Sequence, residues 1–302
     1  MKRLLFVFNP HSGKGLIKNH LLAIIDTFVK AGYNVEVYPT QKREDAREKV
    51  IELNGTYDLV VCSGGDGTVN EVVSGMIASE TKVPIGYIPA GSTNDFGRGI
   101  KIPKKMKRAA DIAVNGQQFP IDMGRFNDRT FVYVAAFGAF TQVSYATSQS
   151  LKNMLGHQAY IIEGAKQLTN IKSIPMKFQI NGEKIEDEFI FGMVTNAKSV
   201  GGFKGIAGKH VRLDDGLFEV TLIKKIRNPL DLNSVLACLM GKNKKSERVV
   251  TYRTDYVEAE SDEAVPWVLD GEFGGDQTKV QIQNQKQIVT FMVGKTTNKP
   301  KE

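Results

Sequence analysis

The stretch that decides the fold is "DLVVCSGGDGTVNEV", Asp58–Val72. It begins with an apolar run that predicts a buried β-strand, breaks into glycines, and continues as the start of a helix. Such a strand–loop–helix unit favours phosphate binding, because glycines let the backbone approach an anion and a helix N-terminus presents N–H groups to it. Asp66, however, places a negative charge between the glycines, where the phosphates would lie.

The sequence around this stretch alternates strand and helix over the first 125 residues. Strands are predicted at 3–9, 34–40, 58–62 and 83–89, and helices at 16–32, 43–55, 68–79 and 107–116. This alternation predicts a parallel sheet covered by helices on both faces. We therefore expect an α/β nucleotide-binding domain over 1–125, with ligands beyond the carboxyl ends of its strands.

The pattern changes after residue 125, where strand signals dominate. An Asn181-Gly182 turn inside 177–194 predicts a hairpin, and further strands are predicted at 216–225, 249–260, 278–283 and 287–293. Helical segments are predicted at 156–168 and 229–241. We therefore expect an antiparallel, β-rich second domain over 126–302.

Composition narrows the class of protein. The chain has 302 residues, 41% of them hydrophobic, and a net charge of +7. No apolar run reaches the roughly 18 residues of a membrane span. Two cysteines are too few for a disulfide framework, which favours the cytosol. Basic clusters at 101–108 and 241–248 favour either solubility or an anionic membrane surface. We expect no nucleic-acid partner, because no zinc, RNA-binding or helix-turn-helix pattern is found.

Two further loops resemble the opening stretch. "FNPHSGKG", Phe8–Gly15, ends the first strand but lacks the spaced first glycine and the Ser or Thr of a Walker loop. Within the opening stretch itself, "GGDGTVN" has Asn70 in place of the third glycine of a dinucleotide fingerprint, which disfavours a hydride-transfer enzyme. "PAGSTNDFGR", Pro89–Arg98, follows the fourth strand. Each alone is also typical of an ordinary turn, but together at one sheet edge they indicate phosphate binding.

A magnesium ion would account for the charge of Asp66. A nucleotide triphosphate usually brings Mg²⁺, which one or two carboxylates hold together with the phosphates. Asp66 would then bind the cation directly or through water, and Asp95 and Asp122 are candidates for the same outer shell. Phosphoryl transfer needs mainly positioning and charge neutralisation, which these groups would supply.

Five motifs in order resemble the diacylglycerol kinase catalytic family, and most closely its soluble bacterial lipid kinases. They are "NPHSGKG", "GGDGTVNEV", "PAGSTNDFGR", "VRLDDGLFEV" (Val211–Val220) and "LDGE" (Leu269–Glu272). The resemblance covers nearly the whole chain. "GGDGT" alone would be less specific, because NAD kinases and phosphofructokinases resemble it.

The resemblance implies an α/β nucleotide domain joined to a β-sandwich domain, and it implies roles for individual residues. Glu272 matches the general base, and Asp66, Asp95 and Asp122 match the magnesium-linked aspartates. A second, structural magnesium would be held by Asp215 and the backbone carbonyls of Arg212 and Leu217. ATP would contact Asn9, Pro10, His11, Ser12, Gly13, Thr40, Gly65, Asp66, Gly67, Thr68, Val69, Asn70, Glu71 and Ser92.

Three of these positions have a second interpretation from the residues alone. "PWVLDGEFGG" is also typical of a plain turn with Asp270 and Glu272 in water, and "RLDDG" of two solvated carboxylates. In the third loop the family usually has threonine directly after the glycine, whereas this chain has Ser92 followed by Thr93. We expect the Ser92 hydroxyl to keep the contact.

The expected activity is ATP- and Mg²⁺-dependent phosphorylation of diacylglycerol to phosphatidic acid. The acceptor lipid and an anionic membrane surface are the expected partners, through basic and apolar surface near the interdomain cleft, with 135–160 as a lipid-facing flank or an ordinary core segment. We expect a cytoplasmic protein, peripheral at the inner face of the membrane, and a homodimer by family analogy. The alternatives are a kinase of a sphingoid base, ceramide or monoacylglycerol, an NAD kinase, or a non-catalytic lipid- or nucleotide-binding regulator.

Overall fold

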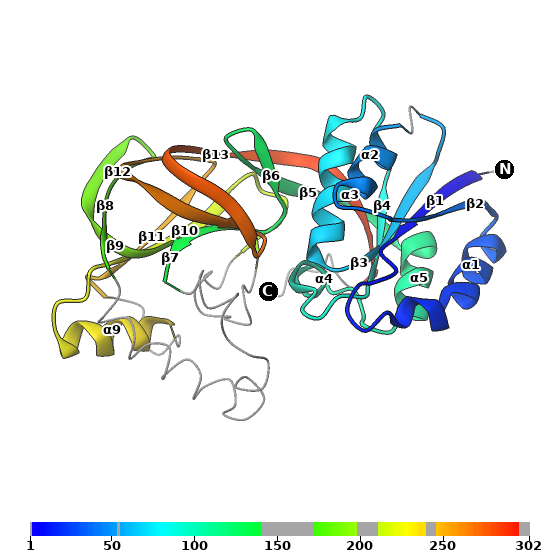
Figure 1. Ribbon diagram of the computed structural model, residues 1–302, viewed down its shortest axis with the longest axis horizontal. Helices are drawn as coiled ribbons and strands as arrows, with labels where there is room; N and C mark the ends of the chain where they lie inside the picture. Colours follow the sequence, from blue (N-terminus) through cyan, green and yellow to red (C-terminus); the bar gives the residue numbers. More distant parts are fainter. Residues whose placement is uncertain (1, 53–54, 140–171, 198–210, 240–245, 296–302) are drawn as a thin grey trace. The chain divides into compact units, whose positions relative to one another are not determined.

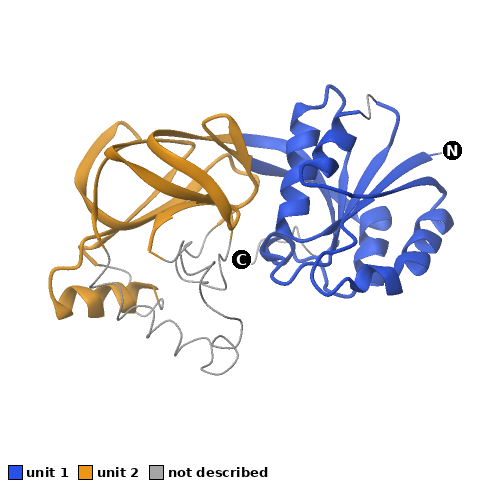
Figure 2. Ribbon diagram, in the orientation of Figure 1, with its two compact units in different colours: residues 1–123, 285–302 blue, residues 124–284 orange. Residues whose placement is uncertain are grey.

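The computed structural model describes residues 2–52, 55–139, 172–197, 211–239 and 246–295. The chain divides into two compact units (Figure 2): unit 1 contains residues 1–123 and 285–302, and unit 2 contains residues 124–284. Strands β5 (Gln117–Phe126) and β13 (Glu272–Val293) each run from one unit into the other. The first boundary lies close to the predicted 125/126, but residues 285–302 belong to unit 1 and not to the second domain.

A parallel sheet forms the centre of unit 1. Its strands are β1 (Lys2–Phe8), β2 (Tyr33–Pro39), β3 (Leu59–Gly64) and β4 (Ile85–Pro89), in the order β4-β3-β1-β2. The pairs β1–β2, β1–β3 and β3–β4 are all parallel. The carboxyl ends of β1, β3 and β4 therefore meet at one edge of the sheet.

The last residues of β13 explain why the C-terminal segment belongs to unit 1. Phe291 pairs with Ile85 at the free edge of β4, and its ring packs against Phe96 at 4.8 Å. Phe291 is fully buried. The short strand predicted at 287–293 is thus the end of one 22-residue strand, which returns the chain to the first sheet.

Helices cover both faces of the sheet of unit 1 (Figure 1). The helices α2 (Asp45–Ile51) and α3 (Asp66–Ala78) pack on one face, and α1 (Leu21–Lys30) and α5 (Met106–Asn115) pack on the other. The helix predicted over 16–32 is a 3₁₀ turn, η1 (Leu16–Asn19), followed by α1, because Asn19 and His20 are weak helix formers. A short helix that the sequence did not predict, α4 (Asp95–Gly99), follows β4.

Unit 2 is built from antiparallel strands and confirms the expected β-rich architecture. They are β6 (Arg129–Phe131), β7 (Val134–Gly138), β8 (Ile174–Ile180), β9 (Glu183–Thr195), β10 (Phe218–Lys224), β11 (Val249–Thr254), β12 (Tyr256–Leu269) and part of β13. The predicted Asn181-Gly182 turn joins β8 to β9, with φ angles of 53° and 81° that suit a tight hairpin.

The sheet of unit 2 folds around a single aromatic core. The first halves of β9 and β12 pair with β8 and their second halves pair with β7, so one continuous sheet bends back on itself. Phe137, Phe178 and Trp267 lie in the core that this sheet encloses. Helix α9 (Pro229–Leu239) matches the predicted segment 229–241, whereas the helix predicted at 156–168 and residues 140–160 of the proposed lipid-facing flank lie outside the described residues.

Candidate active site

The three glycine loops of unit 1 are joined by backbone hydrogen bonds at the carboxyl edge of the sheet. The Asn9 N–H donates to the Ser63 carbonyl oxygen at 2.9 Å. The N–H groups of Ala90 and Gly91 both donate to the Gly64 carbonyl oxygen, at 2.8 and 3.1 Å. Each loop follows its own strand, and because the strands are parallel and adjacent, the loops form one continuous surface.

Close packing between the loops requires glycine at two positions. A Cβ atom on Gly91 would lie 2.5 Å from the Gly65 Cα atom and 2.9 Å from the Asn94 Oδ1 atom. A Cβ atom on Gly13, where φ is 59°, would collide with the Ala90 carbonyl oxygen. The glycines therefore permit contact between loops, in addition to leaving backbone N–H groups accessible.

Asp66 connects the second loop to the third. Its carboxylate accepts hydrogen bonds from the N–H groups of Asp95 at 3.1 Å and Phe96 at 3.2 Å, which begin helix α4. Burial raises the pKa of Asp66, while these two backbone hydrogen bonds and the nearby Arg98 oppose the rise. The negative charge between the glycines thus has a structural partner before any ligand is considered.

A cavity of about 310 Å³ opens beside the first two loops, within unit 1. Five residues predicted to contact ATP line it, together with three residues that sequence reasoning did not select. The predicted residues are Asn9, His11, Thr40, Thr68 and Glu71, and the additional residues are Gln41, Lys42 and Arg43. The volume is at the lower end of the range for small-molecule sites, and the two additional cations suit an anionic ligand.

Glu71 has a structural contact of its own in this cavity. Its carboxylate accepts hydrogen bonds from the N–H groups of Glu44 at 3.1 Å and Ala46 at 3.2 Å, at the start of α2. Lys42 pairs with Glu48 at 2.7 Å. Both contacts hold the segment after β2, so that it forms one wall of the cavity.

The remaining residues predicted to contact ATP lie in the loops or on α3. Ser92 is exposed in the third loop, as is the neighbouring Thr93. The Val69 side chain is fully buried and its N–H donates to the Gly65 carbonyl oxygen, so Val69 acts in packing α3. The others are Pro10, Ser12 and Gly13 after β1, Gly65 before α3, and Gly67 and Asn70 within α3.

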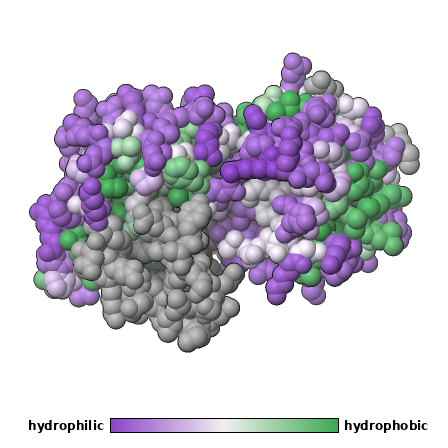
Figure 3. Space-filling model, viewed as in Figure 1, coloured by the Kyte–Doolittle hydropathy of each residue, from purple (hydrophilic) through white to green (hydrophobic). Residues whose placement is uncertain are grey.

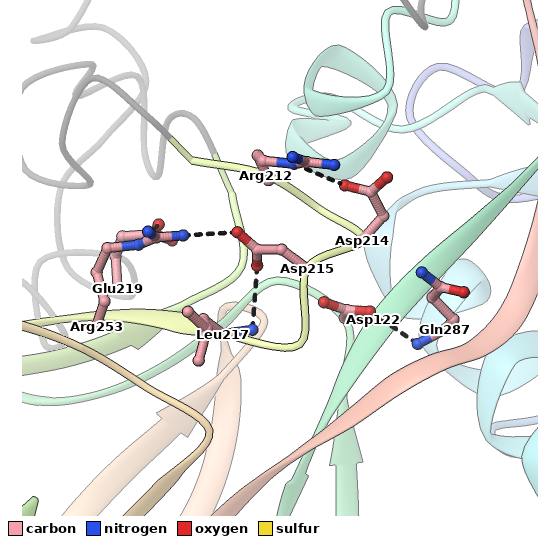
Figure 4. A network of polar contacts seen from close by, with 8 residues as sticks. All are labelled: Asp122, Arg212, Asp214, Asp215, Leu217, Glu219, Arg253 and Gln287. Atoms are coloured by element: carbon pink, nitrogen blue, oxygen red, sulfur yellow. Dashed lines mark hydrogen bonds and ion pairs between the residues drawn. The ribbon is translucent and has the colours of Figure 1, made fainter. Parts of the chain in front are cut away.

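Two further predicted metal-linked aspartates of unit 1 are buried. Asp95 is 5% exposed and its Oδ1 atom lies 3.6 Å from Arg98. Asp122, on β5, is fully buried and accepts a hydrogen bond from the Gln287 N–H at 2.7 Å (Figure 4). Among the described residues, no group of three His, Cys, Asp or Glu side chains is placed to hold a metal ion. Asp66 and Asp95 nevertheless bring two carboxylates to adjoining loops, which suits an ion held mainly by phosphates and water.

In unit 2, Asp215 is the centre of a polar cluster (Figure 4). Its Oδ1 atom accepts the Leu217 N–H at 3.1 Å, and its Oδ2 atom pairs with Arg253 at 2.6 Å. Arg253 also lies 3.5 Å from Glu219, whose two carboxylate oxygens are buried and accept no hydrogen bond from the described residues. Burial raises the pKa of Glu219 to about 7. Arg212 pairs through its side chain with Asp214 at 3.3 Å.

Glu272 and Asp270 have opposite environments in the turn between β12 and β13. Glu272 is exposed at the first position of β13. Asp270 is 7% exposed, and its carboxylate accepts the N–H groups of Val132 at 2.6 Å, Tyr133 at 2.9 Å and Val134 at 3.0 Å. Asp270 is therefore an anchor of this turn and is not solvated, whereas the Glu272 side chain is exposed.

Comparison with known proteins places these loops in a known family. Residues 3–126 match the model of the diacylglycerol kinase catalytic domain. The chain is 33% identical over 277 residues to the diacylglycerol kinase of Bacillus subtilis, covering 91% of each chain. It is 34% identical over 290 residues to that of Staphylococcus carnosus, covering 95% of this chain and 94% of the relative. The chain belongs to the diacylglycerol kinase catalytic family. It is a kinase.

The second unit and the whole fold agree with this family. Residues 134–290 match the model described as "YegS C-terminal NAD kinase beta sandwich-like domain". A crystal structure of a diacylglycerol kinase from Bacillus anthracis superposes with a TM-score of 0.76, covering 98% of both chains at 21% identity, and so has the same fold. No helix in the described part of this kinase is long and apolar enough to cross a membrane.

Sequence reasoning missed two residues that shape the third loop of this kinase. Asn94 has φ of 52°, and its side chain accepts the Gly91 N–H at 2.9 Å and donates to the Gly91 carbonyl oxygen at 2.6 Å. The Tyr87 hydroxyl lies 3.1 Å from both Asn94 Oδ1 and the Gly64 carbonyl oxygen. Asn tolerates the left-handed conformation, which was the available signal in "STND".

Proposed function

We propose that this kinase transfers the γ-phosphoryl group of ATP, with Mg²⁺, to the free hydroxyl of diacylglycerol, giving phosphatidic acid. The observation that carries the proposal is the joining of three glycine loops beside a cavity of about 310 Å³. Relatives at about one-third identity over nearly the whole chain are named diacylglycerol kinases, which supports this acceptor. A sphingoid base, ceramide or monoacylglycerol would use the same phosphate loops.

The nucleotide would bind at the carboxyl edge of unit 1. Backbone N–H groups of the loops after β1, β3 and β4 would donate to its phosphates, and Lys42 and Arg43 supply positive charge at the cavity wall. Because contacts between Gly13, Gly65 and Gly91 join the loops, the donors are fixed before the nucleotide arrives. Fixed donors need no reorganisation as charge develops, and this lowers the barrier to transfer.

Asp66 and Asp95 are the residues that would hold Mg²⁺ with the phosphates, and Asp122 would support them. Their carboxylate oxygens are the ligand type that Mg²⁺ prefers. When bound, the ion neutralises negative charge on the phosphates. Asp66 also keeps α4 in place through the N–H groups of Asp95 and Phe96, so it orients the third loop whether or not a cation is present.

Glu272 would act as the general base. Its carboxylate would take the proton of the lipid hydroxyl as the hydroxyl oxygen bonds to the γ-phosphorus and the bond to the β-phosphate oxygen breaks, leaving ADP. Asp270 would be a positioning residue for Glu272, because its buried carboxylate fixes the turn that directly precedes Glu272.

A second magnesium would be held in unit 2 by Asp215 and the backbone carbonyls of Arg212 and Leu217. The cluster fits a cation, because the Glu219 carboxylate is buried beside it and, within the described part of the chain, is paired with Arg253 at 3.5 Å but accepts no hydrogen bond. Arg253 supplies positive charge there in the metal-free chain. We expect Mg²⁺ to raise the melting temperature of the protein, and Asp215→Asn to remove the part of the increase that this site contributes.

The test is phosphate transfer from γ-labelled ATP to mixed micelles that contain diacylglycerol, ceramide, sphingosine or monoacylglycerol, with and without Mg²⁺. We expect labelled phosphatidic acid that disappears without the metal. Asp66→Asn should abolish turnover while the protein remains folded. Glu272→Gln should lower turnover with little change in ATP affinity, and Glu263→Gln is the control at another exposed glutamate. Label on a different lipid would change the acceptor, and full activity of Asp66→Asn would refute the mechanism.

NAD kinase activity is the second candidate, because the model matched by the second unit is described as NAD kinase-like. NAD belongs in the same assay as a fifth acceptor, with its binding followed by the melting temperature. Labelled NADP in place of any labelled lipid would establish this alternative. A protein that binds ATP and lipid but transfers no label would be a regulator. The proposed acceptor also implies a peripheral location at the inner face of the membrane, and light scattering would test for a homodimer.

A further inference from the structure

Helix α1 of unit 1 exposes apolar side chains that no described element covers. Seven large apolar side chains are exposed in the described part of the chain, and three of them lie on η1 and α1: Leu16 at 48%, Leu22 at 82% and Val29 at 53%. Leu22 and Val29 are seven residues apart, so they lie along one line of the helix, while Ile24 and Phe28 face the core. Figure 3 shows apolar residues gathered on the surface over this part of the molecule.

The same part of unit 1 contains most of the net charge of the protein. Residues 14–30 and 101–115 contain eight Lys or Arg and two Asp, a net charge of +6, whereas the whole chain has +7. The eight basic side chains are exposed; three of them lie on the helices α1 and α5, which pack together, and the other five lie in the segments that precede these helices. The remaining residues therefore sum to a net charge of +1, because acidic residues elsewhere balance the second basic cluster, 241–248.

We propose that this α1–α5 face, formed by residues 14–30 and 101–115, docks on an anionic lipid surface. Leu16, Leu22 and Val29 would enter the boundary between headgroups and acyl chains, and the surrounding Lys and Arg would pair with lipid phosphates. The inference rests on the proposed function, since a kinase of membrane lipids must reach its acceptor from the aqueous side. It places the docking surface on unit 1 alone and includes the basic cluster 101–108 in it.

The charge of the face selects this partner over two others. Two copies of the chain that met through this face would bring two charges of +6 together, and like charges repel. Nucleic acid would match the charge but would leave the exposed leucines and valine in water or against polar phosphates. A lipid surface satisfies both features, because it combines negative headgroups with an apolar layer below them.

The contribution of the basic side chains to docking is tested by sedimentation of the protein with vesicles. One set contains phosphatidylglycerol and phosphatidylcholine, and the other contains phosphatidylcholine alone. Lys104→Gln/Lys107→Gln removes two basic side chains of the face, and Lys172→Gln/Lys184→Gln is the matched control in unit 2. Because a basic side chain near an anionic surface is worth about 1 kcal/mol, binding should weaken about 30-fold in the first variant. The control should bind like the unmodified protein, and added salt should reduce the difference.

The apolar contribution is tested with Leu22→Ser/Val29→Ser, which should also weaken vesicle binding, whereas Leu230→Ser should not. Leu230 is 78% exposed, on α9. All four variants should phosphorylate a short-chain diacylglycerol in neutral detergent as fast as the unmodified protein. Equal vesicle binding by Lys104→Gln/Lys107→Gln and its control would overturn the docking proposal even if phosphorylation is confirmed.

The two proposals fail in different ways. If no lipid is phosphorylated by the unmodified protein, the proposed function fails, but the vesicle comparison still decides whether the face docks on anionic lipid. If Leu22→Ser/Val29→Ser instead converts a dimer to a monomer and leaves vesicle binding unchanged, the face belongs to a second copy of the chain and the docking proposal is overturned.

Discussion

The substitution Asp270→Asn tests the anchor of the turn that carries Glu272. The Oδ1 atom of Asp270 accepts two N–H groups, from Tyr133 and Val134, and the Oδ2 atom accepts the Val132 N–H at 2.6 Å. Asparagine keeps one oxygen and replaces the other with an NH₂ group. In either orientation of the amide, a donor then faces a buried N–H donor.

The expected loss follows from the three hydrogen bonds. A hydrogen bond to a charged group is worth about 1.5–3 kcal/mol, and one between neutral groups about 0.5–1.5 kcal/mol. One bond of about 2 kcal/mol is lost, and the two others each weaken by about 1 kcal/mol, giving about 4 kcal/mol. This is a large part of the roughly 5–15 kcal/mol by which folded proteins are stable.

Trp267 makes the assay specific for unit 2. It is the only tryptophan of the chain and is 1% exposed in the core of that unit. Urea unfolding followed by its fluorescence should therefore report the loss directly. Asp276→Asn, at an exposed position of the same hairpin, is the control. Turnover of Asp270→Asn should also fall under conditions where the protein is folded, because Glu272 is displaced with the turn.

Two outcomes would contradict this reasoning. A change in unfolding free energy below about 1 kcal/mol would mean that the three N–H groups find other partners, since a lost hydrogen bond to a buried charge costs more than that. Normal turnover with the full loss of stability would mean that the turn does not position Glu272. Hydrogen exchange at residues 132–134 measures the local effect, and protection there should decrease.

Three further predictions concern other parts of the chain. Gly91→Ala should lower kcat/KM at least about 100-fold, because a Cβ atom 2.5 Å from the Gly65 Cα atom separates two loops, whereas Gly99→Ala, with no atom of the described residues within 4 Å of the added Cβ, should not. Burial raises the pKa of Glu219 from 4.5 to about 7, so the folded state binds a proton that the unfolded state releases. Unit 2 in EDTA should therefore lose stability as pH rises from 4.5 to about 7, and Glu219→Gln should flatten this slope in urea unfolding. Arg43→Gln should raise the ATP dissociation constant about tenfold if its charge contacts phosphate, as isothermal titration would show; an unchanged constant would place the nucleotide elsewhere.

The elements of the fold were predictable where their signals are local. Apolar runs marked β1, β3 and β4, and the glycines after them marked three loops at one sheet edge. The Asn181-Gly182 hairpin was predictable for the same reason, since both residues adopt positive φ readily. Five of the predicted nucleotide contacts line one cavity because their strands are parallel neighbours.

The contacts that lock the site were not predictable, because they join residues that are distant in sequence. Asp66 bonds to N–H groups 29 and 30 positions later, and Asp270 to groups 136 to 138 positions earlier. A carboxylate next to a glycine looks the same in sequence whether it faces water or caps a distant segment. The return of β13 to β4 has the same origin, since an alternating strand pattern does not identify its neighbour.

Asp66 shows how one carboxylate serves two purposes in a phosphate loop. Each of its oxygens accepts an N–H of α4, so a cation that binds Asp66 must share the carboxylate with the third loop. Loss of turnover in Asp66→Asn would then follow either from a lost cation or from a displaced loop. Hydrogen exchange at the N–H groups of Asp95 and Phe96, measured without nucleotide, separates the two causes. Unchanged protection would leave the cation as the cause, whereas lost protection would show that the charge between the glycines is required first to build the loop.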